Sequence, residues 1–179
     1  MKISRLGCVL VCMLACNTAV LAASASASAP APVAAMRPMI KVNPQAHYKA
    51  VYDIHSGDTT AGISKGLYFA RGLIEAFGKQ GVKPAQLDIH LVLHGDAAKF
   101  LLIDDTYQMA INDPFATNLN AKITQDLLNL GIHVEICHSA MKAMGWTAKD
   151  VLPGVAIVHD GYTRLIQLQN QGYAYIGGF

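Results

Sequence analysis

Hydrophobic residues recur along this chain in two alternating patterns. Short runs rich in β-branched and aromatic residues predict strands, and apolar residues spaced three or four apart predict helices. The predicted strands cover residues 48–54, 87–93, 132–136, 155–158 and 173–176. The predicted helices cover residues 62–79, 97–103, 119–130, 139–144 and 162–170, with one further turn at 147–150 and an irregular segment at 104–114.

Strands that alternate with helices indicate βαβ units, in which helices cover both faces of a parallel sheet. We therefore predict the α/β class, as a flavodoxin-like three-layer sandwich with a mainly parallel five-stranded sheet. Ligands of such sheets bind at the carboxyl ends of strands, near a switch in strand order. The segments that follow the first four predicted strands each contain one histidine, namely His55, His94, His138 and His159.

The amino-terminal residues have the pattern of a secretory signal peptide. Lys2 and Arg5 give a positive start, residues 6–14 are apolar, and Ala22 ends a stretch of small residues suited to cleavage. We expect residues 1–22 to be removed on export, which predicts a periplasmic protein.

The apolar run is shorter than the roughly 20 residues that a spanning helix needs, so no stable membrane insertion is expected. A lipoprotein is disfavoured, because Met13 and Leu14 fit poorly before Cys16. Residues 23–38 are rich in Ala, Ser and Pro and predict a flexible spacer. One folded domain is then expected over residues 39–179.

Charge and composition narrow the choice of partners. The chain is 53% hydrophobic and 15% charged, as expected for a globular domain. Removal of Lys2 and Arg5 with the leader lowers the 14 basic residues to 12, equal to the 12 acidic residues. A mature domain without net charge or a basic run is not expected to bind nucleic acid.

Removal of the leader also leaves Cys137 as the one cysteine of the mature chain. A single cysteine cannot form an internal disulfide, so it is buried and inert, paired between chains, or reactive. Cys137 lies between a predicted strand and a predicted helix, where backbone N–H groups and the helix dipole favour the reactive thiolate. His138 is adjacent and His94 ends the neighbouring predicted strand, so either could take the thiol proton.

Cys137, His138 and His94 are therefore the candidate catalytic residues. Several other chemistries lack their motifs, since the chain has no Cys-x-x-Cys, P-loop, Gly-x-Gly-x-x-Gly or Gly-x-Ser-x-Gly. No cofactor is expected.

Two of the predicted strands carry a polar side, which is unusual for central parallel strands. Asp88, His90 and His94 share one side of the second strand, and His133 and Glu135 share the side of Cys137 on the third. This pattern indicates a subunit interface or a wet cleft, although ordinary hydrogen-bonded histidines would give the same pattern.

Five segments, in this order and spacing, resemble the DsrE/DsrF-like family and in particular its exported single-domain members. They are YKAVYDI (48–54), LVLHGDAAKFLL (91–102), GIHVEICHSAMKAMG (131–145), DVLPGV (150–155) and LQNQGYAYI (168–176). The resemblance implies a flavodoxin-like fold and homo- or hetero-oligomers, often trimers or hexamers. It also implies a persulfide carried on the cysteine after a central strand, the position of Cys137. Many exported relatives have glycine after that cysteine, where this chain has His138.

We interpret the chain as a periplasmic sulfur-handling protein, a sulfurtransferase or sulfur carrier. Cys137 would accept sulfane sulfur from a donor and pass it to an acceptor thiol, and the protein would be a homo-oligomer. The alternative is a non-catalytic module that binds a small molecule or partner at the strand ends. A third interpretation is a zinc or copper site made by Cys137 with His55, His94, His138 and His159. No pair of these residues has the close spacing of a structural zinc site, so no bound metal is expected.

Overall fold

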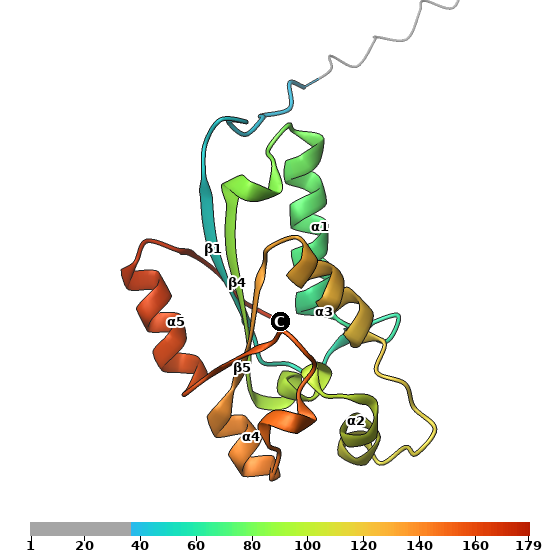
Figure 1. Cartoon of the computed structure of the whole chain (residues 1–179). Helices are drawn as coiled ribbons and strands as arrows, with labels where there is room; N and C mark the ends of the chain where they lie inside the picture. The colour runs from blue at the N-terminus through green and yellow to red at the C-terminus, as the bar shows by residue number, and fades with distance from the viewer. Residues whose placement is uncertain (1–36) are drawn as a thin grey trace, which may run out of the picture. The chain divides into compact units, whose positions relative to one another are not determined.

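Five parallel strands form the central sheet of the computed structural model, which describes residues 37–179 (Figure 1). The strands are β1 (Tyr48–Ile54), β4 (Leu87–Leu93), β5 (His133–Cys137), β6 (Ala156–Val158) and β7 (Ala174–Ile176). They lie in the order β6-β5-β4-β1-β7, and each neighbouring pair is parallel. The predicted α/β class and parallel five-stranded sheet are confirmed. The predicted signal peptide and nearly all of the predicted spacer lie outside the described residues.

The helices cover the two faces of this sheet unequally. They are α1 (Lys65–Lys79), α2 (Asp104–Ile111), α3 (Asn120–Asn129), α4 (His138–Met144) and α5 (Gly161–Asn170). Figure 1 shows α1 and α3 on one side of the strands and α5 on the other. The larger core lies on the side of α1 and includes Phe100, Leu91 and Ile136. On the side of α5 a small cluster joins Val51 and Val92 to two leucines of the helix.

Short 3₁₀ segments occur at Pro84–Gln86, Gly95–Leu101 and Ala148–Asp150. Within residues 37–179 no helix is long and apolar enough to cross a bilayer.

The chain changes direction in the sheet once. From β1 through β4 and β5 to β6 it moves towards one edge, and it then returns to place β7 on the far side of β1. Doubly wound sheets share such a reversal. Counted along the chain, it follows the fourth strand of this sheet, β6, whereas in the flavodoxin order it follows the second strand. Adjacent strands β5 and β6 are therefore followed by helices on opposite faces. Cys137 ends β5 and so lies at this switch point.

Three predicted segments differ from the structure. The helix predicted from residue 62 begins at Lys65, because the preceding residues form a hairpin of β2 (Thr59–Thr60) and β3 (Ile63–Ser64). Gly62 has a φ of +80° in its turn, a conformation that a helix cannot contain.

The segment predicted as irregular after residue 103 is largely helical. Asp104 and Asp105 occupy the first turn of α2, where the helix dipole favours acidic side chains. Asn112 ends the helix in the left-handed conformation, a role usually taken by glycine. The helix predicted over residues 97–103 is instead the 3₁₀ segment Gly95–Leu101.

Packing of α1 on the sheet depends on a glycine. A Cβ at Gly66 would lie 2.6 Å from the Cδ1 and Cγ1 atoms of Ile54, which is fully buried in β1. Gly72 lies on the same helix, and a Cβ added there would have no neighbouring atom within 4 Å. The two glycines form a matched pair.

We predict that Gly66→Ala lowers the free energy of unfolding by about 1–3 kcal/mol through overpacking. Gly72→Ala should raise it by about 0.5–1 kcal/mol, because alanine favours a helix more than glycine. Urea unfolding followed by circular dichroism measures both. Equal stability of the two variants would show that α1 does not pack tightly on β1.

Candidate functional site

Cys137 is the last residue of β5 and the residue that precedes α4. Its side chain is buried, with 4% exposure. The sulfur accepts a hydrogen bond from the backbone N–H of Gly161 at 3.2 Å. Gly161 is the first residue of α5, so the sulfur faces the amino terminus of a ten-residue helix that follows the next strand. Backbone N–H groups and the helix dipole favour negative charge at this position.

A side-chain cap and a close packing contact hold the first residues of α5 in place. Asp160 caps the helix by accepting a hydrogen bond from the Thr163 N–H at 3.0 Å. A Cβ at Gly161 would lie 3.0 Å from the Cβ and Cγ atoms of His94. Glycine therefore lets the helix start approach both the sulfur and the His94 ring.

His94 lies on the other side of Gly161 and is held by its own partner. It is buried, and its Nε2 lies 2.7 Å from Asp53 Oδ1 on β1. The Tyr175 hydroxyl donates to the other oxygen of Asp53 at 2.5 Å. Burial raises the pKa of Asp53, but the hydrogen bonds from Tyr175 and His94 more than offset it, so the pKa is lowered overall. The same hydrogen bond to Asp53 raises the pKa of Tyr175 to about 12.

The structure does not gather the other candidate residues around the sulfur. Within residues 37–179, Gly161 is the hydrogen-bond partner of the Cys137 sulfur. His138 is exposed at the start of α4 and lines a surface hollow with Trp146 and His159. The proposed roles of His138 and His94 in taking the thiol proton stay predictions.

Close groups of metal-binding atoms do form, but elsewhere. In the described part of the chain they are Asp53, His55 and His94 in one group, and Asp88, His90 and His133 in another. Neither group includes the Cys137 sulfur. The interpretation of a metal site made by Cys137 and the strand-end histidines therefore lacks the assembled ligand set that it requires.

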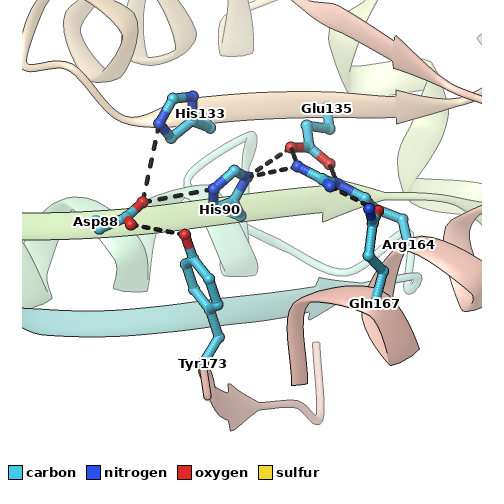
Figure 2. A network of polar contacts seen from close by, with 7 residues as sticks. All are labelled: Asp88, His90, His133, Glu135, Arg164, Gln167 and Tyr173. Atoms are coloured by element: carbon cyan, nitrogen blue, oxygen red, sulfur yellow. Dashed lines mark hydrogen bonds and ion pairs between the residues drawn. The ribbon is translucent and has the colours of Figure 1, made fainter. Parts of the chain in front are cut away.

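Figure 2 shows a second polar network around Glu135. Glu135 lies two residues before Cys137 on β5, so the two side chains share one face of the sheet. Glu135 is 3% exposed and accepts hydrogen bonds from Arg164 Nε and Nη2 of α5, each at 2.8 Å. His90 Nδ1 lies 2.6 Å from Glu135 Oε1. Burial raises the pKa of Glu135, but the hydrogen bonds from Arg164 and His90 prevail and lower it overall. Of the polar strand residues noted in the sequence, Glu135 and His90 are thus paired with each other, whereas His133 is largely exposed.

Several residues of these networks could not be identified from the sequence as site residues, among them Gly161, Asp53 and Arg164. Asp53 has a weak signal in the sequence, since it is the one acidic residue of a strand whose other residues, apart from Lys49, are apolar or aromatic. Asp160 and Gly161 form a helix-start signal, but the strand order is needed to place them beside Cys137.

Comparisons with known proteins agree with this architecture. The model of the DsrE/DsrF-like family matches residues 47–177. One similar structure is that of MTH1491 from Methanobacterium thermoautotrophicum, a protein of unknown function. The TM-score is 0.55 and the identity 21%, and the match covers 73% of this chain and 99% of MTH1491. The ychN protein from E. coli is similar with a TM-score of 0.53 and 17% identity, over the same shares of the two chains. No curated protein matches the sequence. At these identities the two structures support the fold alone.

The buried carboxylate gives a test of the second network. We predict that Arg164→Met lowers the free energy of unfolding by about 3–5 kcal/mol at pH 7, because Glu135 loses its cationic partner. In the wild type the lowered pKa of Glu135 contributes stability above its ordinary value of about 4.5, and this contribution is lost as the pH falls through the lower folded value. The difference between variant and wild type should therefore shrink as the pH falls and Glu135 of the variant becomes protonated.

Arg71→Met is the matched control, since Arg71 pairs with Glu75 on the surface of α1 at 3.0 Å. Its effect should stay below about 1 kcal/mol. Urea unfolding between pH 4 and pH 7 measures both variants. A loss with Arg164→Met that is no larger than the loss with Arg71→Met would contradict the buried pairing.

Proposed function

The chain belongs to the DsrE/DsrF-like family, and on that premise we propose that Cys137 carries sulfane sulfur as a persulfide. Membership in this family points to a role related to sulfur relay. The observation that carries the finer proposal is the contact between the Cys137 sulfur and the Gly161 N–H at the start of α5. It gives an anionic sulfur a hydrogen-bond donor and a favourable helix dipole in a site shielded from water.

The proposed reaction needs no external oxidant. The Cys137 thiolate attacks a sulfane sulfur of a polysulfide, a new S–S bond forms, and the donor S–S bond breaks. The shortened polysulfide leaves with the electron pair. In the second half of the cycle an acceptor thiolate attacks the outer sulfur of the persulfide, and Cys137 leaves as the thiolate. Both halves are thiol–disulfide exchange steps, for which the thiolate is the attacking species.

The geometry favours small donors. Cys137 is almost fully buried, so a bulky disulfide cannot reach its sulfur without movement of the strand-end segments. A short polysulfide or a thiosulfate ion is far smaller, so it needs less movement of these segments to reach the sulfur. The exposed imidazole of His138 lies next in sequence to the cysteine, and we propose it as the group that receives the thiol proton as the donor enters.

A non-covalent binding module is the alternative function. The hollow lined by His138, Trp146 and His159 offers an aromatic ring and two imidazoles at the strand ends. Such a hollow suits a small polar or aromatic ligand. This alternative predicts saturable binding without any covalent change at Cys137.

We further propose that the protein is exported to the periplasm and works there as a homo-oligomer, a trimer or a hexamer. Support for assembly comes from exposed apolar side chains beside the thinly covered face of the sheet. Tyr162 and Ile166 lie four residues apart on α5 with 65% and 59% exposure, and Tyr175 of β7 is 50% exposed. Apolar groups that gather on one surface are typical of interfaces.

We predict that the mature protein gains the mass of one or more sulfur atoms after exposure to polysulfide or thiosulfate. A thiol reductant should remove this mass. Cys137→Ser should gain none, since it removes the one cysteine of the mature chain. Intact-mass spectrometry measures both proteins, with circular dichroism confirming that each is folded.

The untreated sample also reports where the chain begins, which we expect near Ala23, and light scattering of it reports the oligomer. A folded wild-type protein that gains no sulfur from either donor would contradict the persulfide proposal and favour the binding module. Equal gain by Cys137→Ser would place the sulfur on another residue.

A further inference from the structure

Three potential metal ligands meet on the face of the sheet that α5 covers, apart from the Cys137 sulfur. Asp88 and His90 alternate on β4, and His133 begins the neighbouring strand β5, directly beside His90. His90 Nε2 lies 3.5 Å and His133 Nε2 lies 3.9 Å from the same oxygen, Asp88 Oδ1. Figure 2 shows a contact from each of the two imidazoles to the Asp88 carboxylate beside the strands.

These separations suit a single cation better than direct hydrogen bonds. Both exceed the usual length of an N–H···O hydrogen bond, about 2.7–3.2 Å. A tetrahedral ion with bonds of about 2.0–2.1 Å places its ligand atoms about 3.4 Å apart. The group formed by Asp53, His55 and His94 differs in this respect, because His94 Nε2 already contacts Asp53 Oδ1 directly at 2.7 Å.

Neighbouring residues orient two of the three ligands. Glu135 is held by two hydrogen bonds from the Arg164 guanidinium, which can only donate. The Glu135 carboxylate can only accept, so it accepts from His90 Nδ1 at 2.6 Å, a much shorter contact than the 3.3 Å between Arg164 Nη2 and the same nitrogen. In the neutral ring, His90 Nε2 is then the nitrogen with a free lone pair. A carboxylate behind a metal-binding histidine is the usual arrangement in metal sites, where it fixes the tautomer.

Asp88 and His133 complete the arrangement. The Tyr173 hydroxyl donates to Asp88 Oδ2 at 2.6 Å, so Oδ1 stays available to an ion. The His133 ring stacks on the His90 ring at 4.2 Å and is 56% exposed, which leaves it room to turn its Nε2 towards the shared point. Solvent can reach the remaining coordination position from the exposed side.

We propose that Asp88, His90 and His133 form a binding site for one divalent transition-metal ion of the Zn²⁺ type. Two imidazoles and one carboxylate are ligands that Zn²⁺ accepts, whereas Ca²⁺ and Mg²⁺ prefer oxygen alone. The ion would link β4 to β5 and keep an open position for water. The sequence led us to expect no bound metal, and this proposal departs from that expectation because strand pairing brings Asp88, His90 and His133 together.

The test is Zn²⁺ binding by the mature protein after treatment with a chelator. Competition with a chromogenic chelator gives the stoichiometry and affinity, and we expect one Zn²⁺ per chain. His133→Gln and Asp88→Asn should each weaken binding at least about tenfold, since each removes one ligand. Both side chains are partly exposed, so these variants should fold, which circular dichroism checks.

Two controls separate this site from its neighbours. Cys137→Ser and His55→Gln should bind Zn²⁺ with unchanged affinity, because neither residue belongs to the proposed site. Co²⁺ used in place of Zn²⁺ should give an absorption spectrum without thiolate-to-metal charge transfer. The proposal is overturned if the wild type binds no Zn²⁺. It is equally overturned if His133→Gln and Asp88→Asn retain full affinity, or if Cys137→Ser loses binding.

Discussion

Parallel strands are joined by right-handed crossovers, so the direction in which a chain moves along its sheet decides which face each helix covers. In this protein the chain moves one way from β1 to β6 and turns back to reach β7. The return puts α5 alone on its face, opposite the helices of the main core. It also means that α4 and α5 begin at the ends of adjacent strands, β5 and β6, and pack on opposite faces of the sheet. Cys137 precedes α4 and Gly161 begins α5, and the candidate chemistry depends on the hydrogen bond between them.

The same reversal explains why central strands carry so many polar side chains. One helix cannot cover five strands, so part of this face keeps contact with water. Buried charges nevertheless need partners, because an unpaired charge costs several kcal/mol. The structure supplies them in two groups, Asp53 with His94 and Tyr175, and Glu135 with His90 and Arg164. Arg164 belongs to α5, so the packing of this helix and the pairing of Glu135 support each other.

Local features of the fold could be predicted from the sequence, and pairings between distant segments could not. The bounds of β1 and β4 agree with the prediction because each is a continuous run of strand-forming residues ended by a polar segment. Cys137 was placed at a strand end for the same reason. Its partner Gly161 could not be identified, because that contact depends on which strand neighbours β5. The helix α2 was missed because its short sequence has little apolar periodicity.

In the proposed chemistry the first N–H of α5 stabilises a negatively charged sulfur on Cys137. Gly161→Pro removes this donor at the first helical position, whose backbone conformation suits proline, and the proline Cδ takes the place of the amide hydrogen beside the sulfur. Gly161→Ala keeps the donor while adding a similar Cβ beside His94. The most direct measurement is the rate at which each variant is alkylated by iodoacetamide at pH 7, with circular dichroism as a check of folding. We predict that the proline variant is alkylated about tenfold more slowly than the alanine variant, as expected for the loss of a hydrogen bond to a charged group. Equal rates in the two variants would contradict it.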